Sequence, residues 1–188
     1  MGRWQPDAAG RLQQAAFELY AERGYEQTTV AEIAERAGLT ERTFFRHFAD
    51  KREVLFRGSG ELERLIVEAV AAAPPSATPI EAITVGLAAA GVIFDARRRP
   101  YSRQRQSVID ANRELQEREL IKLASLAAAV AAALRRRGVQ DQAAELAAEA
   151  GIAVFRVAFE HWIRDDSDRD FARFVDDGFA ELRTVAAG

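Results

Sequence analysis

Two arginines one helical turn apart, Arg42 and Arg46, are the residues of this 188-residue chain whose type and spacing best suit recognition chemistry. A guanidinium group presents a planar fork of donors that can bond to O6 and N7 of guanine in the major groove of DNA. A separation of four residues places two side chains on the same face of a helix. The pair therefore predicts a helix that reads base edges, provided that the flanking residues form and position such a helix.

The flanking sequence predicts two short helices joined by one tight turn, which is a helix-turn-helix. Thr29 starts a capping-box pattern, and Thr40 is a suitable N-cap for the second helix. Gly38 stands where the first helix must end, because a residue without Cβ tolerates the left-handed conformation of such exits. Phe44 and Phe48 form the inward side of the second helix, so the two arginines lie outside this apolar stripe.

The same run resembles the DNA-binding domain of TetR-family transcriptional regulators. From residue 28 to 55 it reads Thr-Thr-Val-x-x-Ile-Ala-x-x-Ala-Gly-Leu-Thr-x-x-Thr-Phe-Phe-x-His-Phe-x-x-Lys-x-x-Val-Leu, and the likeness extends over residues 8–56. The resemblance implies a ligand-responsive DNA-binding regulator, most often a repressor. It also implies that the residues at the positions of Phe45, His47 and Lys51 meet the DNA backbone.

We predict a set of DNA contacts around the second helix. Thr29 and Thr40 would offer hydroxyls and helix N-termini to phosphate. Glu41 would repel phosphate, so it either accepts from a cytosine amine or is only a first-turn carboxylate favoured by the helix dipole. The predicted set is Thr29, Thr40, Glu41, Arg42, Thr43, Phe45, Arg46, His47 and Lys51. The alternative is a three-helix cap with a solvated, charged outer face.

The composition predicts an all-α protein, because Ala, Leu, Glu and Arg are abundant and only 12 Gly and 5 Pro interrupt them. Start and stop signals predict about nine helices. They include a first helix from Asp7, a long fourth from an Asp50 capping box to Pro74, a fifth from Thr78 to about Ala96, and a ninth from Ser167 or Asp168. We expect a DNA-binding domain over residues 1–54 and a bundle for ligand binding and dimerisation over residues 55–188.

Composition and charge exclude several classes of function. The chain has no cysteine and two histidines, and it has no Gly-rich phosphate loop or nucleophile elbow, so we expect no enzyme and no cofactor. His161 and Asp165 have helical spacing but would be only two ligands, so we expect no metal. No apolar run reaches membrane-spanning length, and we expect a cytoplasmic protein.

The net charge of the chain is −3, and the charges of its predicted DNA-binding head, residues 1–57, are balanced, so we expect this head to bind DNA weakly on its own. Residues 1–57 hold nine Lys or Arg and nine Asp or Glu. Because non-specific affinity comes mainly from phosphate neutralisation, a balanced head has little of it. We expect a small local positive face on an acidic body.

A ligand pocket is predicted among the fourth to eighth helices, since ligand sites are mainly apolar with a few polar anchors. The predicted contacts are Phe94, Tyr101, Arg105, Val108, Ile109, Leu126, Phe155, Phe159 and Trp162. For each residue taken alone, ordinary core or dimer interface is the simpler interpretation. The arginines between residues 97 and 105 either recruit an anionic ligand, such as a coenzyme thioester, or form a solvated connector. We favour the connector, because most charge runs are surface. Some relatives with this type of recognition helix resemble regulators of acyl-coenzyme A-like ligands, which supports the anionic reading.

The last two predicted helices carry broad aromatic faces, which predict a homodimer and a pseudo-palindromic DNA operator. Alternatively these faces are used within one subunit. Gly58 and Gly60 fall inside the predicted fourth helix, where they form either a hinge or a close contact with helix one. The competing function is a helical protein-interaction module without sequence-specific DNA binding.

Overall fold

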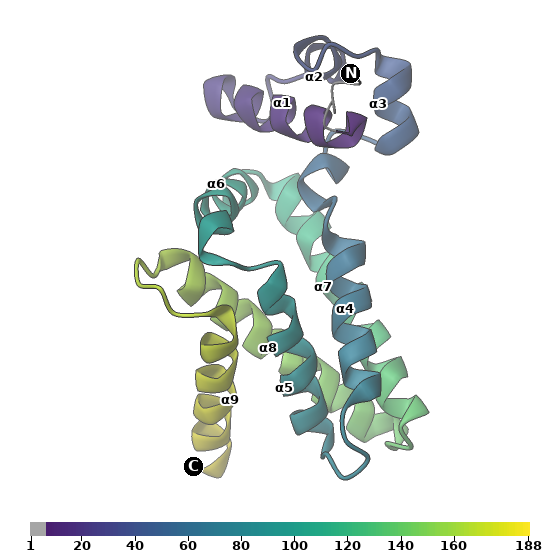
Figure 1. The fold of residues 1–188 in the computed structure, drawn as a ribbon, viewed down its shortest axis with the longest axis vertical. Helices are drawn as coiled ribbons and strands as arrows, with labels where there is room; N and C mark the ends of the chain where they lie inside the picture. Colours follow the sequence, from purple (N-terminus) through teal and green to yellow (C-terminus); the bar gives the residue numbers. More distant parts are fainter. Residues whose placement is uncertain (1–6) are drawn as a thin grey trace, which may run out of the picture. The chain divides into compact units, whose positions relative to one another are not determined.

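The computed structural model describes residues 7–188, and every regular element in that range is a helix (Figure 1). The all-α prediction is confirmed. The elements in the described range are α1 (Ala8–Arg23), α2 (Val30–Arg36), α3 (Glu41–His47), η1 (Glu53–Phe56), α4 (Ser59–Ala72), α5 (Pro79–Ala89), η2 (Ala90–Val92), η3 (Ala96–Arg98), α6 (Arg99–Asp110), α7 (Arg113–Arg136), α8 (Asp141–Arg164) and α9 (Phe171–Ala187).

The chain forms two compact units, and their division falls within α6 and α7. The first unit holds the described residues up to Arg57 together with Gln104–Glu119. Its core includes Leu12, Ile33 and Phe44, all fully buried. Two residues from much later in the chain, Ile109 near the end of α6 and Leu115 near the start of α7, are fully buried in the same cluster. The helix-turn-helix therefore shares its apolar core with a segment distant in the chain.

The local signals of the helix-turn-helix are confirmed. Thr29 and Glu32 form a complete capping box at the start of α2. The Thr40 hydroxyl accepts from the N–H of Thr43 at 3.2 Å at the start of α3. Gly38 has a φ of 63°, the left-handed conformation that the turn between the two helices requires. The capping bonds themselves join residues only three positions apart, and this explains why the sequence reveals them.

The long fourth helix predicted from Asp50 was wrong. The Asp50 carboxylate accepts from the N–H groups of Arg52 and Glu53 at 2.8 and 3.2 Å, but the turn that follows is the short η1. Helix α4 begins only at Ser59. Gly58 and Gly60 therefore lie at its start, and not in its interior. A Cβ at either position would meet no atom within 4 Å.

Two other helix ends differ from the prediction. The fifth helix ends at Ala89 and continues only as the 3-10 turn η2. The ninth begins after Asp170, because Ser167 is used in two local turns. Its N–H donates to the Asp165 carboxylate at 3.2 Å, and its Oγ accepts from the N–H of Arg169 at 3.3 Å. These side-chain bonds hold the backbone in a loop where a helix start was predicted.

The second unit, Gly58–Arg103 and Leu120–Gly188, packs α5 against α4, α8 and α9. Small residues allow these helices to approach closely. A Cβ at Gly86 of α5 would lie 2.6 Å from a methyl of Val70 in α4, and one at Gly151 of α8 would lie 2.6 Å from Cγ2 of Ile83 in α5. Within the described residues, no single helix is long and apolar enough to cross a membrane, and one bent pair, 79–92 with 96–110, meets that test by length and composition only.

Candidate nucleic-acid interface and ligand site

The core of the first unit fixes which face of α3 is exposed. Phe44 is fully buried, and its ring lies 5.5 Å from that of Phe48, measured between centroids. The opposite side of the helix carries Arg42, Arg46 and His47, all exposed, and Phe45, whose side chain is 56% exposed. Glu41 is also exposed, in the first turn of α3. The structure thus brings the predicted base readers together on one accessible surface.

Arg42 and Arg46 differ from every other Lys or Arg in the described part of the first unit, because neither has a carboxylate or carbonyl partner. The others bond within the unit. The pairs are Arg23 with Glu32, Arg36 with Glu22, Arg52 with Asp50, Arg57 with Asp7, Arg105 with Glu119, Arg113 with Glu117 and Arg118 with Glu53. Arg11 and Lys51 bond to backbone carbonyls. The uncommitted positive charge of the unit is therefore concentrated on α3.

The two acidic residues of α1 share one ion-pair partner, Arg36 of α2. Arg36 donates to both carboxylate oxygens of Glu22 at 2.8 Å, and it also reaches Glu18 at 3.4 Å. The hydrogen bond from Arg36 holds the pKa of the Glu22 carboxyl below its usual range. A bidentate pair of this kind fixes the orientation of both side chains. Glu18 and Glu22 therefore serve packing between the two helices.

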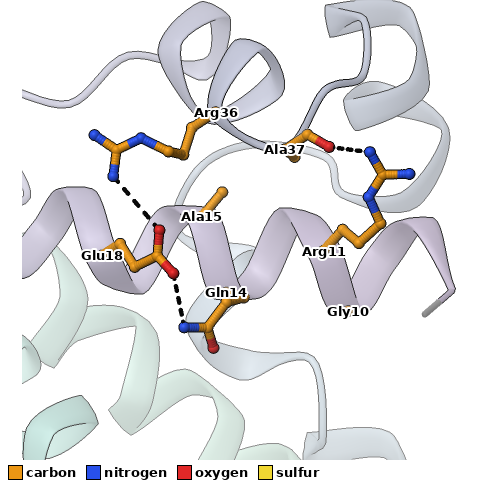
Figure 2. A pocket seen from close by; sticks show the side chains of 7 residues that line it. All are labelled: Gly10, Arg11, Gln14, Ala15, Glu18, Arg36 and Ala37. Carbon is orange, nitrogen blue, oxygen red and sulfur yellow. Dashed lines mark hydrogen bonds and ion pairs between the residues drawn. The ribbon is translucent and has the colours of Figure 1, made fainter. Parts of the chain in front are cut away.

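Beside this pair lies an open cavity of about 400 Å³ between α1 and α2 (Figure 2). Its lining is Gly10, Arg11, Gln14, Ala15, Glu18, Arg36 and Ala37. The guanidinium of Arg11 donates to the carbonyl of Ala37 and, at 3.3 Å, to that of Gly38. Arg11 thus binds the carbonyls of the turn between α2 and α3, a contact that no local sequence pattern predicts.

Three of the predicted phosphate contacts already have partners in the chain. The Thr29 hydroxyl donates to the Glu32 carboxylate at 2.8 Å, and the Thr40 hydroxyl lies 3.1 Å from that of Thr43. The Lys51 ammonium donates to three carbonyl groups of the segment between α1 and α2. For the threonines these bonds are helix caps, which leave the helix N-termini themselves accessible.

The predicted ligand residues are divided between the two units. Phe94, Phe155, Phe159 and Trp162 form one aromatic cluster in the second unit, with ring centroids 5.4 to 6.3 Å apart. Phe171 belongs to the same cluster, with its ring centroid 4.7 Å from that of Phe94, and it was not among the predicted ligand contacts. None of these rings lines the cavity between α1 and α2 or a second, smaller cavity beside Arg99 and Arg103.

The remaining members of that predicted set are placed differently. Leu126 belongs to the apolar core of the second unit, and Tyr101 is 37% exposed on α6. Val108 and Ile109 pack in the core of the first unit. Arg105 also lies there, where Nε donates to the Leu55 carbonyl at 2.7 Å. The nine residues are therefore divided between the two units, and their role as ligand contacts stays a prediction.

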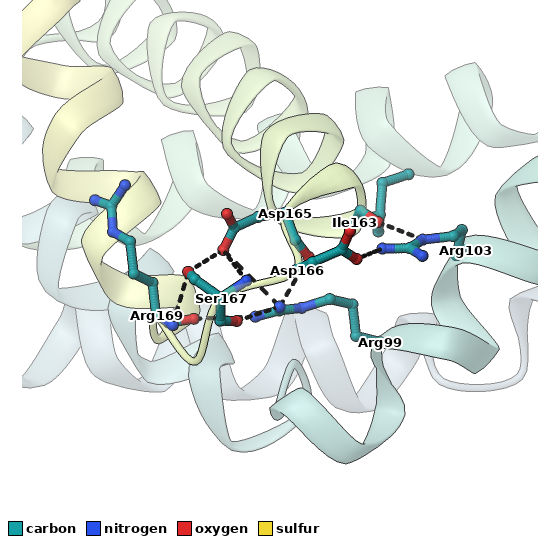
Figure 3. Close-up of polar contacts among 7 residues, drawn as sticks. All are labelled: Arg99, Arg103, Ile163, Asp165, Asp166, Ser167 and Arg169. Carbon is teal, nitrogen blue, oxygen red and sulfur yellow. Dashed lines mark hydrogen bonds and ion pairs between the residues drawn. The ribbon is translucent and has the colours of Figure 1, made fainter.

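The arginine cluster is not a solvated connector throughout, so that expectation was wrong for Arg99. Arg99 is only 6% exposed, and its guanidinium donates to the carbonyls of Asp165, Ser167 and Arg169 (Figure 3). It also lies 5.2 Å from the ring centroid of Trp162. Burial of a guanidinium is costly unless its donors find acceptors, and these carbonyls accept from both terminal nitrogens, whereas the buried Nε has no hydrogen-bond partner. Arg99 thus fixes the loop between α8 and α9.

Arg103 supports the same loop. Its Nε donates to the Ile163 carbonyl at 2.7 Å and its terminal nitrogen to the Asp166 carboxylate at 3.0 Å. A cavity of about 200 Å³ lies between these groups. Arg97, by contrast, has a side chain that is 92% exposed, as a connector residue would.

Comparison with known proteins decides the family. Residues 12–57 match the model of bacterial regulatory proteins, tetR family, and residues 77–187 match that of the MftR C-terminal domain. The second match alone covers more than half of the chain. The chain belongs to the TetR family of transcriptional regulators. Its function is therefore DNA binding with ligand response in general, and not catalysis.

Two named relatives support the TetR-family assignment. The transcriptional regulator TcmR of Streptomyces glaucescens is 38% identical over 74 residues, which are 39% of this chain and 33% of TcmR, so the chain matches only about a third of that relative's length. The putative mycofactocin biosynthesis transcriptional regulator MftR of Mycobacterium tuberculosis is 27% identical over 173 residues, 89% of this chain and 85% of that protein.

Solved structures show the same TetR-family fold. FadR from Bacillus subtilis, in complex with stearoyl-CoA, superposes with a TM-score of 0.59 at 20% identity over 92% of this chain and 96% of that chain. A putative transcriptional regulator from Pseudomonas aeruginosa PAO1 gives a TM-score of 0.65 at 18% identity over 99% and 94%. At these identities the likeness concerns the fold alone.

Proposed function

We propose that this TetR-family regulator is a repressor that binds a pseudo-palindromic operator as a homodimer and is released by a small acyl-type, anionic effector. Arg42 and Arg46 read base edges in this proposal. The observation that carries it is that these two guanidinium groups are exposed and have no partner in the described chain, whereas the other cations of the first unit are engaged. Side chains held free and one turn apart on an exposed helix suit direct readout.

The other predicted DNA contacts position the helix in the groove. The N-termini of α2 and α3, capped by Thr29 and Thr40, offer backbone N–H groups to phosphate. Thr43, Phe45 and His47 would meet the backbone beside them. Glu41 lies in the first turn of α3, where the dipole favours a carboxylate and a cytosine amine could be its partner.

Dimerisation through α8 and α9 is supported by their exposed apolar side chains. Leu146 and Val157 of α8 are 65% and 50% exposed, and Val185 of α9 is 71% exposed. Two such subunits related by a two-fold axis would present two α3 helices to successive major grooves, which implies a pseudo-palindromic operator. Light scattering after gel filtration tests this step, and a monomer at micromolar concentration would contradict it.

The effector proposal rests on the aromatic cluster and on exposed cations near it in sequence. Phe94 and Phe159 are partly exposed members of this cluster and offer apolar surface for an acyl chain, and the exposed Arg97 and Arg98 could attract an anionic group. The B. subtilis FadR structure holds stearoyl-CoA, which supports an acyl-type ligand for the same fold. Titration with stearoyl-CoA by calorimetry is the test. Absence of heat and of any effect on DNA binding would contradict an acyl-CoA effector.

The proposed reading of DNA is tested by selecting operators from random duplexes with the wild-type protein. Arg42→Ala and Arg46→Ala should each lose about 1–3 kcal/mol of discrimination at one base position. Arg64→Ala is the matched control, because Arg64 is exposed on α4 and pairs only with Glu68. If no sequence is enriched, the helical protein-interaction module becomes the better interpretation. If both arginine variants keep the wild-type preference, the base readers are other residues.

A more specific target is favoured by one observation. The match of residues 77–187 to the MftR C-terminal domain, together with the M. tuberculosis relative, points to genes of mycofactocin biosynthesis. A mobility shift with the promoter of such a gene cluster, with a shuffled duplex as control, tests this target. Equal binding to both duplexes would contradict it.

A further inference from the structure

We propose that Lys51 is a positioning residue for DNA binding, which holds the segment leading into α2, and that it does not contact phosphate. The proposal rests on the proposed function, in which the first unit reads an operator. It reverses the role that the family resemblance implies for this lysine. The reversal comes from the bonds that its side chain makes.

All the donors of the Lys51 side chain are engaged within the first unit. The ammonium nitrogen lies 3.0 Å from the carbonyl oxygen of Tyr25, 3.1 Å from that of Thr28 and 3.4 Å from that of Glu26. An ammonium group has three donors and no acceptor, so none is left for phosphate. The same nitrogen lies 4.2 Å from the centroid of the Tyr25 ring, a favourable cation–π distance.

The segment that Lys51 holds determines where α2 begins. It starts after Gly24, whose φ is 85°, and it ends at Thr29, the N-cap of α2. Thr28 is almost fully buried, and its hydroxyl donates to the Gly24 carbonyl at 2.8 Å. The Tyr25 carbonyl also accepts from the N–H of Thr28 at 3.2 Å, but the carbonyls of Glu26 and Thr28 need a donor at this point, because unpaired polar groups cost free energy. Lys51 is that donor.

The backbone of Lys51 is held from a second side. The hydroxyl of Tyr20, a buried residue of α1, donates to the Lys51 carbonyl at 2.9 Å. Only three residues separate Lys51 from His47, the last residue of α3. The residue therefore links the end of α3 to both α1 and the start of α2. We infer that this link fixes the direction in which α3 presents Arg42 and Arg46.

Lys51→Met separates the two roles, because it keeps the unbranched stem and removes the donors. Binding to a duplex of random sequence is measured over a range of salt concentrations. A phosphate contact contributes about 0.9 to the slope of log K against log salt for each lysine. We expect the slope of Lys51→Met to equal that of the wild type. A slope reduced by about 0.9 per subunit would overturn the proposal.

Affinity for a duplex selected by the wild-type protein gives the second readout. We expect Lys51→Met to lose about tenfold or more in this specific affinity, comparable with loss of one good base contact, while non-specific affinity stays unchanged. Arg113→Met is the matched control, since Arg113 is a cation of the same unit whose side chain is 91% exposed. Equal loss on specific and random duplexes would favour phosphate contact and overturn the proposal.

Hydrogen exchange tests the positioning role without DNA. In Lys51→Met the amides of residues 28–33 should exchange faster than in the wild type, those of α5 should be unaffected, and Lys51→Arg should restore protection because guanidinium also donates to carbonyls. An unchanged exchange pattern in Lys51→Met would overturn the proposal. If the wild type selects no duplex, the proposed function fails, whereas the exchange pattern and the salt slope still decide the role of Lys51.

Discussion

Nε of Arg118 lies 2.5 Å from Oε1 of Glu53, and this ion pair joins the start of α7 to η1 within the first unit. The two side chains are only 31% and 20% exposed. Partly buried pairs with good geometry contribute more than exposed ones, because solvent screens them less. We expect a double-mutant cycle with Glu53→Gln and Arg118→Gln to give a coupling free energy of about 1 kcal/mol in urea unfolding.

The exposed pair Arg113–Glu117 provides the matched control for that cycle. It joins residues four apart in the same helix, and its side chains are 91% and 63% exposed. We expect its coupling to be about 0.3 kcal/mol. Equal couplings for the two pairs would mean that the Arg118–Glu53 bond adds nothing to the first unit beyond a surface contact.

The capping box of α2 should make the stability of the helix-turn-helix depend on acid. The N–H of Thr29, followed by its hydroxyl, lowers the pKa of the Glu32 carboxyl below its usual range. A lowered folded-state pKa means that the stabilisation is present above the unfolded-state pKa and is lost as pH falls through the folded-state value. Glu32→Gln should therefore lose less stability than the wild type between neutral pH and pH values below about 4.

Chemical unfolding at a series of pH values measures this effect. Glu35→Gln is the control, because Glu35 is exposed on the same helix and its carboxylate has no partner among the described residues. We expect the control to keep the acid dependence of the wild type. If Glu32→Gln and Glu35→Gln behave alike, the capping box does not contribute to the acid sensitivity.

The sequence predicts features that depend on residues close together in the chain, and it does not predict those that depend on residues far apart in the chain. The Thr29 capping box and the left-handed Gly38 depend on residues within a few positions, so the chain itself reveals them. Arg99 bonds to carbonyls 66 to 70 residues away, and its place in a run of charged residues suggested only that it lies on the surface. Ile109 was predicted to line a ligand site on the basis of its apolar type, and the structure places it in the core of the first unit. Apolar type does not say which of two cores a residue joins.

The close approach of α5 and α8 predicts a cost for adding one methyl group. A Cβ at Gly151 would lie 2.6 Å from Cγ2 of Ile83, a buried side chain whose branched Cβ leaves it little freedom. Overpacking of this kind costs about 1–3 kcal/mol, and the higher helix propensity of Ala offsets about 1 kcal/mol. We expect Gly151→Ala to lower the free energy of unfolding by about 1 kcal/mol.

Thermal and urea unfolding of a second variant checks the cause. Ile83→Leu keeps the side-chain volume but moves the branch away from Cβ, so the double variant with Gly151→Ala should recover part of the loss. If the double variant is less stable than the sum of the two single changes predicts, the contact between residues 83 and 151 does not explain the cost.

Gly58 and Gly60 allow a direct test of the hinge hypothesis, because alanine fits at both positions. Gly58 has a φ of −82°, and a Cβ at either glycine meets no atom within 4 Å. Gly60→Ala should therefore stabilise α4 by about 0.5–1 kcal/mol through helix propensity. If the glycines supply needed flexibility at the boundary between Arg57 and Gly58, the double alanine variant should fold at least as well but respond less to effector.

The measurement compares affinity for a selected duplex with and without stearoyl-CoA, together with the melting temperature. A smaller ratio of the two affinities at an equal or higher melting temperature is the expected result, because the substitution restricts the backbone without disturbing a contact. The single variant Gly91→Ala, also open at Cβ but within the second unit, is the control. Unchanged DNA affinity and unchanged response in the double variant would refute the hinge.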